Sequence, residues 1–142
     1  MKNFISGIPS SDIDQVWKAC LPFIEAAANK GQAEMTTDDI YHFCKEARMQ
    51  LWIIFDENHK IQAAATTEII DYPAKKVCRL VTLGGTNFDD WMESIQVIEE
   101  WASERNCVSL ETFCRKGFLR KLNNYGYKQT YVVLGKDLTT LH

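Results

Sequence analysis

Two glutamates in strand-like segments are the side chains of this sequence best suited to act as a general base. Glu111 lies in CVSLETF (107–113) and Glu68 lies in IQAAATTEII (61–70), and both segments are otherwise mostly apolar or small. A carboxylate can take a proton from an amine directly or through a bound water. A solvent-facing or ion-paired strand position would suit a glutamate equally. We therefore treat Glu111 and Glu68 as candidate bases.

A cluster of cations near the end of the sequence could bind phosphate. Its members fall within seven residues and are Arg115, Lys116, Arg120 and Lys121. Arg115 and Lys116 come first in a helical pattern, where side-chain charge and unpaired backbone amides can act together on an anion. A solvated helix face or a nucleic-acid backbone would use the same charges. We expect Arg115 and Lys116 to be phosphate ligands.

The charge of the chain is unevenly distributed. The net charge is −3, yet residues 1–111 carry 10 basic and 18 acidic groups, whereas residues 112–142 carry 6 basic groups and 1 acidic group. A local basic patch on an acidic body favours a phosphate-bearing ligand over general coating of nucleic acid. No helix-turn-helix or aromatic RNA-binding motif accompanies the cations, so we do not expect a nucleic-acid partner.

Tyr125 and Cys114 are two further candidates for chemistry. Tyr125 precedes Gly126, and a phenol there could donate a proton to a leaving group, although packing of the ring in the core is the alternative. Cys114 follows a strand-like segment near cations, but no histidine lies close to it in the sequence. The 5 cysteines contain no CxxC pair and the 3 histidines lie far apart. We expect neither a disulfide framework nor a bound metal.

Length and composition predict an ordinary folded domain. The 142 residues are 46% hydrophobic and 25% charged, which excludes disorder and suits a single domain over 1–142. The longest apolar runs, such as 51–55, are far too short to cross a membrane. The first residues lack the apolar run of a signal peptide. The sequence therefore predicts a cytoplasmic protein without a membrane partner.

The first helix is predicted from a capping pattern. Ser11 and Asp14 have the spacing of a capping box, and apolar residues follow at helical intervals, so a helix should start near Asp12. Pro22 lacks a backbone donor and should kink or restart the helix. Gly31 should end it.

The spacing of apolar residues in the rest of the chain alternates between that of helices and that of strands. Thr36 and Asp39 form a second capping pattern, which predicts a helix over 38–48. Helical spacing returns over 88–105 and in the basic segment 117–125, which Gly126 should end. The segments predicted as strands are 51–55, 61–70, 77–83, 107–113 and 127–138.

This order of elements resembles the GNAT (Gcn5-related N-acetyltransferase) fold over nearly the whole chain. The clearest local piece is FLRKLNNYGYKQTYVVLGKDL (118–138), which looks like the family's helix that runs into a Gly-aromatic pair and a final strand. The resemblance implies an α+β fold with a central, mostly antiparallel twisted sheet. Two N-terminal helices, a central helix and a short C-terminal helix would accompany that sheet.

The resemblance also implies a reaction, the transfer of an acyl group from acetyl-CoA or another acyl-CoA to an amine. In the family, the acyl-CoA lies between the strands that match 77–83 and 107–113, and its pyrophosphate meets the start of the helix between them. Backbone amides of strand 77–83 would polarise the thioester carbonyl, with Glu111 or Glu68 as the base. The positions implied to bind the cosubstrate are Leu83, Gly84, Gly85, Thr86, Asn87, Arg115 and Lys116, and Tyr125 would be a proton donor.

Two departures from the family pattern keep a second interpretation open. The family's phosphate loop reads Q/R-x-x-G-x-G/A, but this chain has GGTNFDDW, and Asp89 and Asp90 would repel a pyrophosphate. Leu122 occupies the position of the family's usual tyrosine acid. The alternative is a non-catalytic GNAT-like binding or assembly protein, similar to compact members encoded by bacteriophages. A phage-encoded protein would be located in the host cytoplasm. A homodimer through a sheet edge and a small-molecule or protein acceptor are both compatible with the sequence.

Overall fold

The computed structural model describes residues 2–29 and 34–139, and the chain divides into two compact units, Met1–Thr112 and Phe113–His142. The first unit contains a five-stranded sheet in the order β1-β2-β3-β4-β5. The strands are β1 (Asn3–Ile8), β2 (Gln50–Asp56), β3 (Ile61–Asp71), β4 (Lys76–Gly85) and β5 (Ser109–Thr112). The helices are α1 (Ile13–Asn29), α2 (Thr37–Lys45), α3 (Phe88–Trp91) and α4 (Ile95–Glu104), with α5 (Lys116–Asn123) in the second unit.

The predicted α+β fold with a mostly antiparallel sheet is confirmed. Strands β1 to β4 pair antiparallel in sequence order, and β5 returns parallel to β4 after the central helices. A parallel return needs a long crossover, which the segment 86–108 supplies. Strand β1 was not predicted, because its sequence NFISGI has two small residues and only partial burial. Its pairing with β2 makes it a strand.

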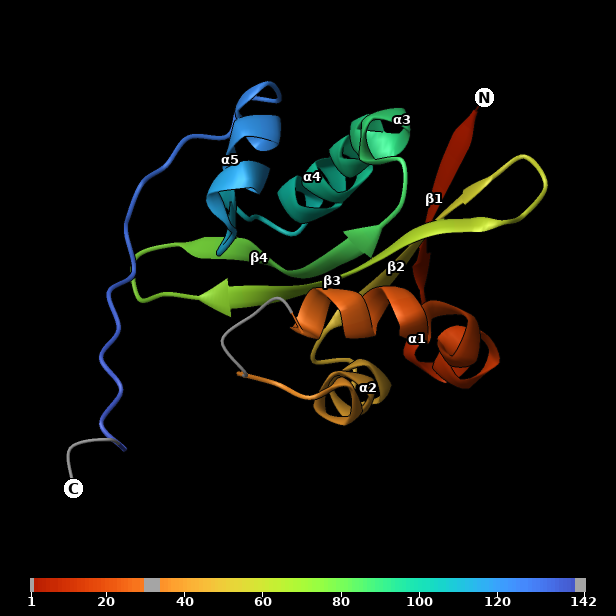
Figure 1. Cartoon of the computed structure of the whole chain (residues 1–142), viewed down its shortest axis with the longest axis horizontal. Coiled ribbons are helices and arrows are strands. Elements are labelled where there is room, and N and C mark those ends of the chain that lie inside the picture. The colour runs from red at the N-terminus through yellow and green to blue at the C-terminus, as the bar shows by residue number, and fades with distance from the viewer. Residues whose placement is uncertain (1, 30–33, 140–142) are drawn as a thin grey trace. The chain divides into compact units, whose positions relative to one another are not determined.

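The sheet of the first unit carries helices on both faces (Figure 1). Helices α1 and α2 cover one face, where Ile24, Ile40 and Leu51 belong to one buried cluster. On the other face, Trp52 packs edge-on against Trp101 of α4 with ring centroids 5.2 Å apart. Because neighbouring strand residues point to opposite faces, Leu51 packs on the face covered by α1 and α2, and Trp52 packs on the face covered by α4.

Helix α1 corrects two expectations from the sequence. It runs through Pro22 without a break, so the helix does not restart there, whereas the expected kink stays a prediction; Cys20 and Ile24, on either side of the proline, are buried. The Ser11–Asp14 capping box does not form, since the chain enters the helix through a 3₁₀ turn, η1 (Ser10–Asp12), that has no side-chain cap. The predicted end at Gly31 lies outside the described residues.

The second capping box is confirmed. The Asp39 amide donates to Thr36 Oγ1 at 3.1 Å, and the Thr36 amide donates to Asp39 Oδ2 at 2.9 Å. Helix α2 ends at Lys45, three residues earlier than predicted, because Ala47 takes a left-handed conformation with φ of 60°. The amides of Arg48 and Met49 then return to the Phe43 carbonyl.

Other predicted elements differ in extent. The helix expected over 88–105 is divided into α3, a 3₁₀ turn (η2, Met92–Ser94) and α4. Helix α5 ends at Asn123, two residues earlier than predicted, and Gly126, with φ of 90°, lies in the turn that follows, where the Tyr127 amide donates to the Leu122 carbonyl at 3.3 Å. The strand expected over 127–138 was wrong, since none of these residues is paired with another strand. A strand forms only where a neighbour can pair its amides and carbonyls.

No helix among the described residues is both long and apolar enough to cross a membrane.

Candidate active site

Strands β4 and β5 pair over only part of the length of β4, and we call the point where their pairing ends the fork. Their pairing begins at Val77 and Ser109 and ends at Leu80 and Thr112, where β5 stops. The Thr112 hydroxyl donates to the Leu80 carbonyl at 2.9 Å and closes the last rung. Strand β4 continues to Gly85, so its final residues have β3 on one side and no β5 residue on the other.

A β-bulge in β4 immediately follows this fork. Thr67 pairs with Leu80 but Thr66 pairs with Thr82, so Val81 is an extra residue in β4. The threonines of the next rung, Thr66 and Thr82, are buried and their hydroxyls lie 2.7 Å apart. An extra residue bends the strand and reverses which of the following amides face β3.

The bulge directs two backbone amides to the open edge of β4. The Thr86 amide donates to the Gln62 carbonyl at 3.0 Å, so it faces β3. Because the direction of the amides alternates along a strand, that of Gly84 also faces β3, whereas those of Leu83 and Gly85 face away from it. An unpaired amide of this kind can stabilise a developing negative charge on the carbonyl oxygen of a substrate.

Gly84 brings β4 close to α1. A Cβ atom at this position would lie 2.2 Å from the Phe23 carbonyl oxygen and 3.4 Å from the Cβ of Ala27. Such a distance to a backbone atom is far below van der Waals contact, so only glycine fits without movement of the helix or the strand. Gly84 therefore fixes the separation between α1 and the part of β4 that follows the fork.

The loop after β4 offers fewer amides than the sequence predicted. The Thr86 amide is already bonded, and the Thr86 carbonyl accepts a hydrogen bond of 2.6 Å from the Trp91 indole. Asn87 is exposed and left-handed, with φ of 55°. Helix α3 has only 4 residues and carries Asp89 and Asp90 in its first turn. A helix this short has a weak dipole, and the two aspartates oppose an anion.

The two predicted bases lie on one face of the sheet, on either side of an arginine. Glu68 of β3 is opposite Arg79 of β4, and Arg79 is opposite Glu111 of β5, one rung before the fork. Residues in register on adjacent strands share a face. The structure thus brings Glu68 and Glu111 together and adds Arg79, which sequence reasoning missed. Aligning the register of the 61–70 and 77–83 segments would have placed Arg79 beside Glu68.

Glu111 is held by donors from two residues. Arg79 donates to Glu111 Oε1 from Nε at 3.0 Å and from Nη2 at 2.9 Å, and Tyr72 donates to the same oxygen at 3.1 Å. The Arg79 Nη2 also donates to the Tyr72 hydroxyl at 3.2 Å. These donors orient the carboxylate and compete with any substrate proton for Oε1. Tyr72, in the β3–β4 turn, was also missed by sequence reasoning.

Glu68 is held less firmly than Glu111. Among the described residues, its carboxylate forms an ion pair of 3.6 Å between Oε1 and the Arg48 Nε. Arg48 is largely exposed and stacks over the Phe43 ring at 4.4 Å, whereas the Glu68 side chain is only 21% exposed. Glu68 therefore combines partial burial with a carboxylate that few donors occupy, which suits proton acceptance better than the environment of Glu111.

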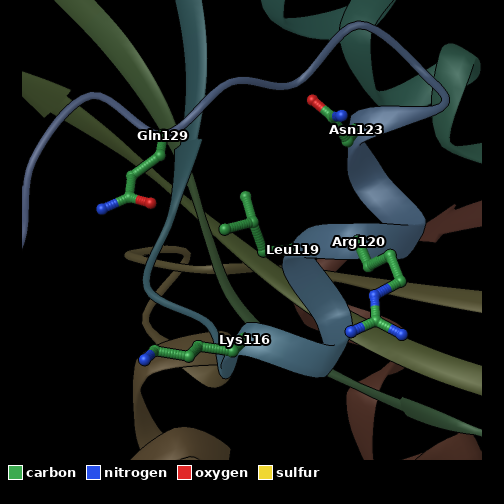
Figure 2. A pocket seen from close by; sticks show the side chains of 5 residues that line it. All are labelled: Lys116, Leu119, Arg120, Asn123 and Gln129. Atoms are coloured by element: carbon green, nitrogen blue, oxygen red, sulfur yellow. The ribbon is translucent and has the colours of Figure 1, made fainter.

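The predicted cationic residues belong to the second unit. Arg115 is the N-cap residue of α5, whose first turn contains no acidic side chain. Beside α5 lies a hollow of about 330 Å³, lined by Lys116, Leu119, Arg120, Asn123 and Gln129. Figure 2 shows Leu119 directed toward the segment that carries Gln129, while Lys116 and Arg120 extend to different sides of the helix. The two cations therefore do not converge on one point.

The predicted proton donor Tyr125 also lies in the second unit. It lies two residues after the end of α5, is 37% exposed, and its amide donates to the Leu122 carbonyl at 2.9 Å. Leu122, which stands where the family usually has a tyrosine, is buried. A role for Tyr125 as an acid stays a prediction.

Neither a reactive thiol nor a metal centre is found among the described residues. No group of three histidine, cysteine or acidic side chains could hold a metal ion there. Burial raises the pKa of Cys20 to about 11 and that of Cys78 to about 12. Burial also raises the pKa of Cys114, the cysteine considered as a nucleophile, and a protonated thiol is a poor nucleophile.

Comparison with known proteins gives a fold but no close relative. No family model matches the sequence. No curated protein matches it either. Among solved structures, an aminoglycoside acetyltransferase from an uncultured soil metagenomic sample, crystallised with trehalose, is 14% identical, with a TM-score of 0.69 and 96% of each chain covered.

Two further solved structures agree with this result. Glucosamine-6-phosphate N-acetyltransferase from Arabidopsis thaliana is 12% identical, with a TM-score of 0.66, 97% of this chain covered and 99% of the other. Another soil metagenomic aminoglycoside acetyltransferase is 6% identical, with a TM-score of 0.72 and the same coverage. At such identities the likeness is one of fold, and these neighbours are acetyltransferases.

Proposed function

Because this chain has the GNAT acetyltransferase fold, we propose that it is an N-acetyltransferase that moves the acetyl group of acetyl-CoA to a primary amine. The observation that carries the proposal is the fork of β4 and β5 after Leu80, where the bulge directs the amides of Leu83 and Gly85 to the open edge. These amides suit a thioester carbonyl, whose oxygen gains negative charge as the amine attacks.

The residues of the fork fit acetyl-CoA in part. Leu83 and Gly85 supply donors for the acyl end, and when bound the cosubstrate supplies an activated acetyl group. The loop after β4 is less suitable for its phosphates, since the Thr86 amide is occupied and Asp89 and Asp90 are close by. We therefore assign phosphate binding chiefly to Arg115 and Lys116 of the second unit, whose helix has no acidic residue in its first turn.

The proposed roles follow from the proton balance of the reaction. The substrate enters as an ammonium group and gives up one proton to become a nucleophilic amine. The amine nitrogen then forms a bond to the acetyl carbon and loses a second proton, while the carbon–sulfur bond breaks and the sulfur takes up a proton. We assign the proton of the amine to Glu68, because few donors occupy its carboxylate. Glu111, oriented by Arg79 and Tyr72, would accept a hydrogen bond from the incoming ammonium group. Tyr125 is the proposed donor to sulfur.

The test of this function is turnover. Purified protein is incubated with acetyl-CoA and a panel of primary amines that includes amino sugars, polyamines and a lysine peptide, and released thiol is measured with a chromogenic disulfide. We expect amine-dependent thiol release that a Glu68→Gln, Glu111→Gln double variant loses. Full turnover by this double variant would remove both glutamates from the mechanism.

A specific observation favours a second function, that of a non-catalytic binding module. The first turn of α3 carries Asp89 and Asp90, and Leu122 is buried where the family usually has a tyrosine. In a protein that no longer bound acyl-CoA, the two aspartates and the leucine would impair no function. Such a module would bind no acyl-CoA, and its Arg115→Glu, Lys116→Glu variant would bind its partners as the wild type does.

A further inference from the structure

Strand β1 is an edge strand that lacks the features by which proteins usually protect such an edge. Among the described strands it pairs with β2 alone, and its register with β2 runs from Asn3 to Ile8 without a bulge. Its sequence, NFISGI, contains no charged residue and no proline. Lysine, proline or a bulge commonly blocks an edge, because free amides and carbonyls can pair with another chain. Strand β1 is therefore suited to pair with a further strand.

Two hydrogen bonds from one side chain identify the backbone groups of β1 that face outward. Gln50 Nε2 donates to the Ile8 carbonyl at 2.8 Å and to the Leu51 carbonyl at 3.0 Å. Ile8 and Leu51 lie opposite each other, so one donor reaches both carbonyls only if both point into the space between the strands. This direction alternates along a strand, so every second residue of β1, counted from Ile8, faces β2. The residues whose amides and carbonyls face the outer edge are therefore Asn3, Ile5 and Gly7.

We propose that β1 pairs antiparallel with β1 of a second copy of this chain, about a two-fold axis at Ile5. In this register Asn3 of each copy lies opposite Gly7 of the other, and all the outward amides and carbonyls of β1 gain partners. Pro9, the next residue whose backbone faces outward, has no amide and ends the ladder. An axis at either neighbour of Ile5 would pair fewer of these groups within β1. Because the same edge is used by both copies, the assembly closes as a dimer.

The side chains of β1 suit this register. Residues that lie opposite each other on paired strands share a face of the sheet and contact one another. Phe4, whose side chain is 40% exposed, lies opposite Ser6 of the other copy, which is small and exposed. The Phe4 ring also stacks on Phe55 of β2 with centroids 5.7 Å apart, so it is already held at the edge. The second copy would cover the part of this ring that β2 leaves exposed.

Charged residues at the two ends of β1 favour the same partner. Lys2 directly precedes the strand, and Asp12 follows it in η1. The antiparallel arrangement brings Lys2 of each copy toward the end of β1 that Asp12 follows in the other copy. Opposite charges that approach in this way favour one orientation and one partner over others. The occupant of the edge is therefore a second copy of this chain, and the proposal does not depend on acetyl transfer.

The mass in solution tests whether two copies associate through β1. Sedimentation equilibrium of the wild type should give twice the mass of one chain. Ile5→Pro removes the outward amide at the axis from both copies but no amide that faces β2, and an edge strand tolerates proline at such a position. This variant should raise the dissociation constant of the dimer by at least about tenfold. Ile5→Val keeps the amide and should leave the mass unchanged. A wild type that is monomeric at every concentration would overturn the proposal, as would an Ile5→Pro variant that dimerises as tightly as the wild type.

Disulfide trapping tests the register and leaves the backbone of β1 intact. Phe4→Cys and Ser6→Cys are each made in a Cys114→Ser background, because Cys114 is exposed. An equimolar mixture of the two variants is diluted and concentrated again, so that subunits exchange, and is then mildly oxidised.

The proposed register predicts which of these samples forms a cross-link. The mixture should give a disulfide-linked dimer of one Phe4→Cys chain and one Ser6→Cys chain, because these positions lie opposite each other. Either variant alone should give far less, since its two introduced thiols are offset along the strands by more than a disulfide can span. No cross-link in the mixture would overturn the proposal, and so would a single variant that cross-links as well as the mixture does.

Discussion

Arg79 places two of its nitrogens on a single oxygen of Glu111, at 3.0 and 2.9 Å, one rung before β4 and β5 separate. The two side chains are 27% and 31% exposed, so solvent only partly screens their attraction. Their strands are separated in sequence by two helices, α3 and α4. The pair thus joins β5 to the rest of the sheet beside the fork that the proposed reaction requires.

Removal of the Arg79 guanidinium should weaken the fold by a modest amount. Arg79→Met keeps the approximate length of the side chain but removes both guanidinium hydrogen bonds to Glu111, which keeps the hydrogen bond from Tyr72. Partly exposed ion pairs contribute up to about 1 kcal/mol, which is the loss expected here. Urea denaturation of Arg79→Met, Glu111→Gln and the double variant gives the coupling energy. Strictly additive effects would show that the pair contributes nothing.

The two glutamates should differ in their effect on catalysis. Glu68→Gln should lower kcat by about 10²- to 10⁴-fold, the usual contribution of a general base, because few donors occupy its carboxylate. Glu111→Gln should act mainly on KM for the amine, since Glu111 is proposed to hold the ammonium group. Glu100→Gln, on the exposed side of α4, is the matched control. A normal kcat in Glu68→Gln with a large loss in Glu111→Gln would reverse the assignment.

Gly84 should tolerate no side chain. Gly84→Ala places a methyl 2.2 Å from the Phe23 carbonyl oxygen, and we expect a loss of about 1–3 kcal/mol in the free energy of unfolding. Gly117→Ala is the control, because a Cβ there meets nothing within 4 Å and Gly117 lies within α5. In a helix this change should stabilise by about 0.5–1 kcal/mol. Equal unfolding midpoints for the two variants would refute the close approach of β4 to α1.

Because of Asp14, the free energy of unfolding should fall as the pH is lowered into the acid range. A hydrogen bond from Lys45 at 2.7 Å, and a second from Tyr41, lower the pKa of Asp14 from its ordinary value of 3.8. A group whose pKa is lower in the folded state stabilises the fold above its unfolded pKa, and this contribution is lost as pH falls through the folded pKa.

The comparison with a variant isolates this effect. Asp14→Asn should be less stable than the wild type at neutral pH, and the difference should shrink as the pH falls below about 4. Denaturation midpoints at a series of pH values measure it. Gln15→Ala, next to Asp14 on the exposed surface, controls for local changes in α1. A difference that stays constant down to the lowest pH would exclude a role for the charge of Asp14.

The contrast between the two capping patterns shows how far sequence reasoning reached. Thr36 and Asp39 form the predicted capping box, because the two residues are close in sequence and their side chains bond to each other's backbone amides. Ser11 and Asp14 have the same spacing, yet Asp14 bonds to Tyr41 and Lys45 of α2 instead. Local chemistry was sufficient for the first pattern, whereas a tertiary contact overrode the second.

The candidate site was predictable only in part, for a similar reason. Residue types pointed to Glu68 and Glu111, but Arg79 and Tyr72 join them through strand register and a turn, which involve pairing between distant segments. The bulge at Val81 leaves no mark in the sequence, although it decides which amides face the open edge. The segment over 127–138 has a strand-like sequence, but its state depends on a partner that the sequence does not specify.

Binding of acetyl-CoA tests the central claim most directly. In a thermal-shift titration, a ligand at about 100 times its dissociation constant should stabilise the protein by roughly 2.7 kcal/mol. We predict a saturable upward shift with acetyl-CoA, a smaller shift with dephospho-CoA, and a much weaker one in Leu83→Pro, which lacks the amide at the open edge but keeps the amides that face β3. The absence of any shift with acetyl-CoA and with short and medium acyl-CoAs would contradict the account and favour the non-catalytic module.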